Sequence, residues 1–249
     1  MDTKGADTTG SEGARVTVRP MRAGGENGYD IVVNSQWATA GDYIEALNQA
    51  VLELPLDRGR DRGLRSCRGC DLCCRERLPI TSVDVRILMD ATGERDLYRF
   101  LGRYAQVVVN GRTVDITMAR DAEGCAFLDP RMRQCREYDS RPLACQTFIC
   151  CPLTRRAESL RDILINTGED ELVRWWLSEA DGERRPVIHE GSLAGLSGMD
   201  VPATPYSGRE GYHQVLLKEV CPAELWNELR AERPGERDRR KAGSRRRGR

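Results

Sequence analysis

The chain has 249 residues, enough for one domain with a buried core and short appendages. Its 39 Lys and Arg balance 39 Asp and Glu, but residues 230–249 hold ten basic and three acidic residues, so an acidic body carries a basic tail. No stretch approaches the roughly 18–20 apolar residues of a membrane span, and the N-terminus lacks the apolar centre of a signal peptide. These features predict a cytoplasmic protein with no membrane segment.

The N-terminal part is predicted to contain a hairpin and a helix, which we assign to residues 15–66. Residues 1–14 are rich in Gly, Thr and Asp and predict a disordered N-terminus. Two runs between residues 15 and 33 alternate apolar and polar side chains around a Gly-containing turn, which predicts a β-hairpin. From Ala40 to Leu54, apolar residues recur at three- and four-residue steps, which predicts a helix that Pro55 ends. The polar segment after it predicts an exposed loop.

Cysteines dominate the next segment. Four fall within eight residues: Cys67, Cys70, Cys73 and Cys74. Three more follow at even intervals: Cys125, Cys135 and Cys145. Thiolates two residues apart on one loop converge on a common point, as a metal ion or an iron–sulfur cluster requires. In a reducing compartment accessible thiols stay reduced, so metal is expected rather than disulfides. Seven thiols suffice for one four-thiolate site with three spare, or for two sites that share ligands.

The spacing favours an iron–sulfur cluster. Cys67, Cys70 and Cys73 with a remote fourth thiol follow the pattern by which one loop holds three irons of a cubane cluster. Zinc or mononuclear iron is the alternative cofactor, and buried thiols without metal are the other possibility. Because neighbouring side chains diverge, Cys73 and Cys74 are not expected to serve one metal ion equally; one of them reaches a second site or stays a reactive thiol.

The two histidines add little to this picture. His189 and His213 both lie outside the cysteine-rich region. We expect each to be a surface or capping residue, so the ligands would be sulfur alone. Such soft ligands exclude magnesium and calcium.

The segment between the two cysteine groups predicts scaffold elements. Thr81 and Asp84 form a capping-box pattern that begins a helix reaching Gly93, and a second short helix is expected from there to about residue 105. The Asn110-Gly111 pair between two β-branched runs predicts a hairpin over residues 106–118. This hairpin would bring Cys125 back toward the first cysteine group.

The second cysteine group carries a resemblance to a known family. It reads Cys125-Ala-Phe-Leu, then Cys135, then Tyr138-x2-Arg141-Pro142-x2-Cys145. With the earlier Cys-x2-Cys-x2-Cys-Cys, this order resembles the YkgJ-type cysteine-cluster (CxxCxxCC) family, described as a zinc- or iron-chelating domain. The resemblance covers about residues 67–150 and implies that the seven cysteines bind metal. We assign residues 67–152 to this metal-binding core.

Two features of the core need separate interpretation. Where the family pattern continues with a basic residue and a Pro-containing stretch, this chain has Cys150-Cys151-Pro152, so Cys150 and Cys151 are possible additional ligands. Arg141 could hydrogen-bond thiolate sulfur or neutralise a negative cluster, and otherwise is a surface residue before a helix that Pro142 begins. Tyr138 is more consistent with a core ring than with a proton donor. The isolated Cys221 is expected to be a small buried hydrophobe.

The remainder, residues 153–231, predicts a helical extension. Apolar stripes indicate helices over 153–165 and 170–180, a Gly-, Ser- and Pro-rich loop over 182–210, and a final helix from about Lys218 to Ala231. Adjacent Trp175 and Trp176 lie about 100° apart on a helix, which favours core packing over a substrate platform. Residues 232–249 predict a disordered basic tail, with weak attraction to nucleic acid or anionic surfaces as the alternative.

The predicted fold class is therefore α+β, a small and mainly helical domain with short β-hairpins around a cysteine-rich metal site. The leading function is a metal-binding cysteine-cluster protein with an iron–sulfur cluster or zinc, in a redox or metal-handling role. One alternative is an enzyme of protein modification, since the resemblance extends to flagellin lysine methylases. Another is a zinc-stabilised interaction module whose tail contacts nucleic acid. The sequence names no catalytic residue and no protein partner.

Overall fold

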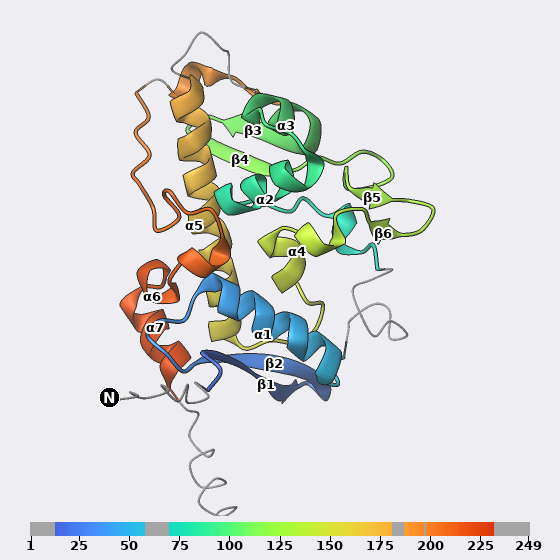
Figure 1. Ribbon diagram of the computed structural model, residues 1–249, viewed down its shortest axis with the longest axis vertical. Helices are drawn as coiled ribbons and strands as arrows, with labels where there is room; N and C mark the ends of the chain where they lie inside the picture. Colours follow the sequence, from blue (N-terminus) through green and yellow to red (C-terminus); the bar gives the residue numbers. More distant parts are fainter. Residues whose placement is uncertain (1–12, 58–69, 181–186, 197, 232–249) are drawn as a thin grey trace, which may run out of the picture.

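The computed structural model describes residues 13–57, 70–180, 187–196 and 198–231. Its elements are helices and three antiparallel strand pairs, which confirms the predicted α+β class (Figure 1). The predictions for residues 1–12, for most of the loop at 56–66, for Cys67 and for the basic tail fall outside the described residues. Within the described ranges, none of the helices combines the length and the apolar character that crossing a membrane requires.

The predicted N-terminal hairpin and helix are present. Strand β1 (Val16–Ala23) pairs with β2 (Glu26–Val33), with Val16 opposite Val33. Helix α1 (Ala40–Glu53) begins at Thr39, whose hydroxyl accepts a hydrogen bond from the Asp42 backbone N–H. The Asp42 carboxylate in turn accepts from the Thr39 N–H, so both ends of a capping box are satisfied. The buried face of α1 then packs against the hairpin.

The scaffold between the cysteine groups also matches the prediction. Helix α2 (Ser82–Thr92) begins with the Thr81–Asp84 capping box, and Gly93 ends it at φ +71°, a conformation that favours glycine. Helix α3 (Leu97–Tyr104) leads directly into the hairpin of β3 (Ala105–Asn110) and β4 (Thr113–Met118). Both edges of this hairpin are covered, because residues 187–190 run beside β3 and residues 78–80 beside β4.

Helix α5 (Arg155–Ala180) corrects one prediction, because it runs unbroken where two helices were expected. Gly168, near the predicted break, lies against the start of α2. A Cβ added to Gly168 would meet Cγ2 of Thr81 at 2.5 Å. The glycine therefore serves a close approach between α5 and α2 and does not end a helix.

The last predicted helix is also corrected. Instead of one helix from Lys218, the structure has α6 (Leu217–Val220) and α7 (Ala223–Arg230). Pro222 separates them, because it has no backbone N–H to continue the first helix and its fixed φ suits the start of the second. The predicted loop at 182–210 includes the short 3-10 turn η3 (Leu193–Leu196), and η4 (Tyr212–Gln214) follows it.

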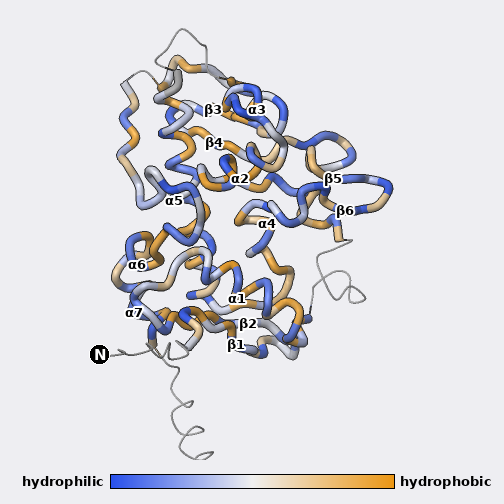
Figure 2. Tube along the Cα trace, viewed as in Figure 1, coloured by the Kyte–Doolittle hydropathy of each residue, from blue (hydrophilic) through white to orange (hydrophobic). Residues whose placement is uncertain are grey.

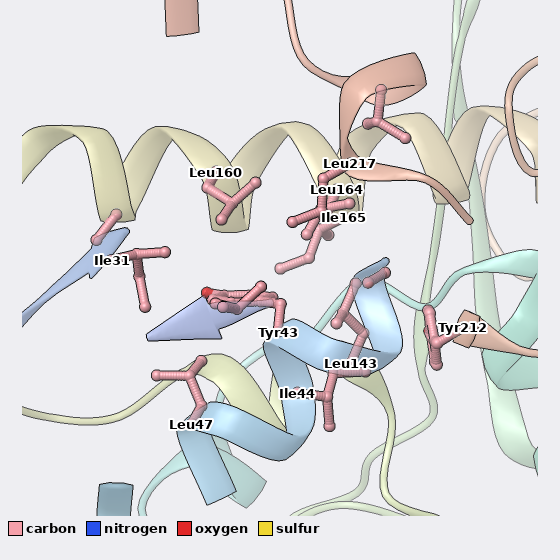
Figure 3. Close-up of a cluster of buried hydrophobic side chains, with 14 of the residues drawn as sticks. Ile31, Tyr43, Ile44, Leu47, Leu143, Leu160, Leu164, Ile165, Tyr212 and Leu217 are labelled. Atoms are coloured by element: carbon pink, nitrogen blue, oxygen red, sulfur yellow. The ribbon is translucent and has the colours of Figure 1, made fainter. Parts of the chain in front are cut away.

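The buried residues form two hydrophobic cores. The first core joins β1, β2, α1, α4 (Leu143–Thr147), α6, α7 and the N-terminal half of α5. Figure 3 shows Tyr43 of α1 facing Leu160 and Leu164 of α5. The second core joins α2, α3, β3, β4 and the C-terminal half of α5. Figure 2 shows hydrophobic stretches of chain in both cores and hydrophilic ones along the turn between β5 (Leu128–Asp129) and β6 (Gln134–Cys135). In Figure 1, α5 connects the cores on one side, and the cysteine-bearing segments lie on the other.

Candidate metal centre

Short elements carry the cysteines, each held by local hydrogen bonds. Cys73 and Cys74 lie in the 3-10 turn η1 (Cys73–Arg75). Cys135 ends β6 (Gln134–Cys135), which pairs with β5 (Leu128–Asp129). After the turn η2 (Tyr138–Ser140), Cys145 lies on α4 (Leu143–Thr147). Cys125 lies just before β5, and its N–H donates to the carbonyl oxygen of Cys74 at 2.8 Å.

These segments enclose a hollow of about 70 Å³, which we call the sulfur hollow. Seven cysteines line it: Cys70, Cys73, Cys74, Cys125, Cys135, Cys145 and Cys150. Cys73 and Cys145 pack against the first core, whereas Cys125 and Cys135 pack against the second. The hollow therefore lies where the two cores meet, and six of the seven cysteines predicted as ligands share its wall. The seventh, Cys67, is outside the described residues.

The thiols line this space without forming a closed ligand shell. Among the described residues, no group of three or more Cys, His, Asp or Glu side chains has the arrangement of a metal site. Cys73, Cys74, Cys125, Cys135 and Cys145 are not in disulfides. The wall therefore holds reduced sulfur that is gathered but not preassembled into a coordination polyhedron.

Thiol electrostatics differ around the wall. A hydrogen bond from Cys74 lowers the pKa of Cys73 to about 7, and the same bond raises the pKa of Cys74 far above its ordinary value. Burial raises the pKa of Cys125, Cys135 and Cys145, most strongly for Cys145. Of these five thiols, Cys73 is accordingly the one that ionises most readily at neutral pH.

Gly124 permits the close approach of the two cysteine groups. It has φ +133°, and a Cβ there would meet Cδ2 of Leu128 at 2.9 Å and the carbonyl oxygen of Cys74 at 3.2 Å. A side chain at this position would push Cys125 away from η1. Glycine thus allows the backbone contact that joins Cys125 to Cys74.

Asp71, which the sequence analysis did not single out, ties the first cysteine group to the β5–β6 hairpin. Its buried carboxylate accepts from Nη2 of Arg133 at 2.5 Å and from Nη2 of Arg75 at 3.1 Å. The hydrogen bond from Arg133 lowers the pKa of Asp71. Because Arg133 lies in the turn before Cys135, this contact fixes Cys135 relative to η1. The position of Asp71 between Cys70 and Cys73 was the available signal.

Asp84 has a second role that its capping-box position did not reveal. Its fully buried carboxylate accepts from the Leu143 N–H at 2.8 Å and from the Tyr212 hydroxyl at 2.6 Å, in addition to the Thr81 N–H at 2.9 Å. Burial raises the pKa of Asp84 to about 6. Through Leu143 the carboxylate holds the first turn of α4, and so it positions the helix that carries Cys145.

Arg141 and Tyr138 both line the sulfur hollow. The Arg141 guanidinium lies 3.9 Å from the centre of the Tyr138 ring, and its Nε donates to the Tyr138 carbonyl oxygen at 2.9 Å. Its positive charge contributes to lowering the pKa of Cys73 and opposes the rise at Cys135. Tyr138 is half-buried beneath Arg141 rather than within either core. Pro142 is the N-cap of α4, one position before the first helical residue where it was expected.

The remaining cysteines and the two histidines differ in whether they lie near the sulfur hollow. Cys150 lies on the wall, but Cys151 is buried in the first core, as is Cys221. His189 accepts a hydrogen bond at Nδ1 from the Val107 N–H, and Nε2 of His213 lies 3.4 Å from Glu45 on the surface.

The two tryptophans divide as expected for core packing. Trp176 is 1% exposed and donates from Nε1 to the Val187 carbonyl oxygen, whereas Trp175 is partly buried with Arg86 over its ring.

Comparison with known families agrees with the position of these cysteines. Residues 66–159 match the CxxCxxCC family model. That family is described as a "Putative zinc- or iron-chelating domain". The match spans less than half of the chain and contains the whole sulfur hollow as described, together with Cys67 and the first residues of α5. No curated protein and no solved structure matches the chain.

Proposed function

We propose that this protein holds an iron–sulfur cluster in the sulfur hollow through cysteine thiolates. One observation carries the proposal: seven cysteines from separate segments line a single small space. Isolated buried cysteines would be expected to scatter through both cores, as Cys151 and Cys221 do in the first core. The zinc- or iron-chelating description of the matched family supports the same chemistry.

The size and composition of the hollow favour a cluster over a single metal ion. At about 70 Å³ the space is several times the roughly 10–15 Å³ that one water-sized sphere needs. A closed zinc site takes four thiolates, so the seven cysteines of the hollow are more than a single zinc ion uses. No histidine lines the hollow among the described residues, so the ligands there are soft sulfur atoms. Zinc or mononuclear iron is the second choice.

The proposed ligands are those the sequence nominates. They are drawn from Cys67, Cys70, Cys73, Cys74, Cys125, Cys135 and Cys145, with Cys150 as an additional candidate. Metal binding requires these thiols to lose protons and to close around the centre. Arg141 is placed to offset part of the negative charge that several thiolates would bring. When bound, the cluster would supply one-electron redox chemistry.

A second candidate function is that of an enzyme of protein modification related to the flagellin lysine methylases. The favouring observation is a larger cavity that shares Cys73 with the sulfur hollow, since a purely structural metal site needs no adjoining space.

The interaction-module hypothesis depends on the tail at 232–249, and loss of salt-sensitive nucleic-acid retention on deleting the tail would support it.

Metal analysis on anaerobically purified protein tests the proposal. We expect a brown protein with broad absorption near about 400 nm and with iron and acid-labile sulfide in equal amounts. Colourless protein that holds stoichiometric zinc would show that the site binds zinc and not a cluster. Protein that retains neither metal after reconstitution with iron, sulfide or zinc would overturn the proposal altogether.

A further inference from the structure

A second cavity adjoins the sulfur hollow and is much larger, with a volume of about 650 Å³. We call it the α5 cavity, because Arg161, Asp162, Ile165 and Asn166 of α5 form one wall. The segment from Leu72 to Pro79 forms a second wall, and Ala144 of α4 with Phe148 and Cys150, which follow α4, forms the rest. Cys73 and Cys150 line both spaces. A volume between roughly 300 and 1,000 Å³ is typical of sites for small organic molecules.

The walls of the α5 cavity combine apolar surface with a few charges. Apolar side chains make up half of the lining: Leu72, Leu78, Pro79, Ala144, Phe148 and Ile165. Four charged residues face it, two basic and two acidic: Arg77, Arg161, Glu76 and Asp162. A ligand that fits would therefore have an apolar body and a single polar group.

Arg161 is the charged residue that decides the polarity of that group. It is 8% exposed, whereas Glu76, Arg77 and Asp162 are all exposed. A charge in a less polar environment attracts an opposite charge more strongly than an exposed charge does. The buried guanidinium therefore favours an anionic group over a cationic one.

The ion pairs of Arg161 are with two exposed carboxylates, which leaves its guanidinium able to bind a further anionic group. Among the described residues, its ion pairs are with Asp162 at 2.9 Å and Glu158 at 3.6 Å, and both carboxylates are more than half exposed. Its carbon Cζ lies 4.7 Å from the centre of the Phe148 ring. A guanidinium has five N–H donors in a planar fork, which is suited to a carboxylate. Phe148 offers an aromatic surface beside that fork.

From this arrangement we infer that the α5 cavity binds a small organic carboxylate with an apolar body, its anionic group on Arg161 and its body between Phe148 and Ile165. Binding itself is independent of the proposed function. The placement of the ligand beside a metal centre at Cys73 rests on that function.

The probe for this inference is 4-phenylbutyrate, compared with the neutral 4-phenylbutyramide and with 4-phenylbutylammonium. Titration of the metal-loaded full chain, monitored by NMR or calorimetry, should give a dissociation constant of about 1 mM for the carboxylate. The amide should bind at least five-fold more weakly, and the ammonium more weakly still.

Two variants locate the site. Arg161→Gln should remove the preference for the carboxylate over the amide, whereas Arg155→Gln, an exposed arginine on the same helix, should keep it. Asn166→Trp places a large ring at an exposed position of the cavity wall and should block all three probes, with Arg155→Trp as its control. If Arg161→Gln does not fold, the inference is tested by Asn166→Trp with its control Arg155→Trp and by the affinities of the three probes for the wild-type chain.

Equal affinity for the carboxylate and the amide would overturn the inference, as would carboxylate binding that survives Asn166→Trp. Iron, sulfide and zinc are measured on the same samples. Protein that holds metal but binds no carboxylate refutes the α5 cavity as a carboxylate site and leaves the metal centre standing. Protein that binds the carboxylate through Arg161 but retains no metal after reconstitution with iron, sulfide or zinc supports the site and refutes the proposed function.

Discussion

The sulfur hollow and the α5 cavity share Cys73 but differ in how they are built. The hollow is small and lined by seven thiols from segments that hydrogen bonds and a buried carboxylate hold together. The cavity is roughly nine times larger and lies against one long helix, and its wall combines apolar side chains with the buried charge of Arg161. The first suits an inorganic centre and the second an organic molecule. Cys73 lies in the wall of both spaces, so a metal centre held there would adjoin a bound organic molecule.

The largest effect is expected from Cys73→Ser, which should reduce metal binding in the sulfur hollow. Serine oxygen is a harder and less acidic donor than thiolate sulfur, so bound iron or zinc per chain should fall at least ten-fold. Metal analysis with absorption spectra measures this loss. Cys221→Ser, at a buried cysteine away from the hollow, should retain full metal. Equal metal content in the two variants would contradict the assignment of the hollow as the metal site.

Asp84→Ala tests how α4 is positioned. The substitution leaves the Leu143 N–H and the Tyr212 hydroxyl without their buried acceptor, so the free energy of unfolding should fall by about 3 kcal/mol. Chemical denaturation measures the change. The matched control is Asp96→Ala, which removes the N-cap of α3 and should cost about 1 kcal/mol. If both variants cost the same, Asp84 acts merely as a cap.

Asp71→Asn tests the contact between η1 and the β5–β6 hairpin. Loss of the charge weakens its bonds from Arg133 and Arg75, which should lower the free energy of unfolding by about 1–2 kcal/mol and speed metal release. Denaturation and transfer of metal to a chelator measure these effects. Asp90→Asn breaks the exposed pair with Arg95 and should change stability by less than about 0.5 kcal/mol. Metal release as slow as in the wild type would show that the contact does not hold the hollow.

The smallest effect is a pH dependence that should leave both spaces intact. Burial raises the pKa of Glu169 to about 7, from an ordinary value of 4.5, while its Oε1 accepts from the Ile116 N–H. Between these values the folded chain keeps a proton that the unfolded chain has lost, so the free energy of unfolding falls as pH rises from about 4.5 to 7.

Replacing Glu169 by Gln removes this titration. Glu169→Gln should reduce the slope of that part of the stability curve, to which Asp84 also contributes below about pH 6, and should add on the order of 1 kcal/mol above pH 7. Denaturation curves at several pH values measure it, with the exposed Glu123→Gln as control. A Glu169→Gln curve parallel to that of the wild type would show that the carboxyl titrates normally in the folded chain.

The sequence by itself determined the local elements and the close spacing of the first group of thiols. Both capping boxes, at Thr39 and Thr81, and the Asn110-Gly111 turn depend on residues within a few positions of one another, so their patterns are legible without the fold. The close spacing of the first cysteine group likewise restricts where its sulfur atoms can lie. Strand pairing in the two longer hairpins and the extent of α1 and α2 were therefore predictable.

Tertiary structure alone decided the rest. Gly168 lies within α5 because it contacts Thr81, not because it ends a helix. Cys150 lines the sulfur hollow and Cys151 does not, because Cys151 is buried in the first core. Asp84 reaches Leu143 across 59 residues, and the α5 cavity exists because α5 passes beside the Leu72–Pro79 segment. Contacts between residues far apart in the chain leave no period or spacing in the sequence, so a single sequence cannot display them.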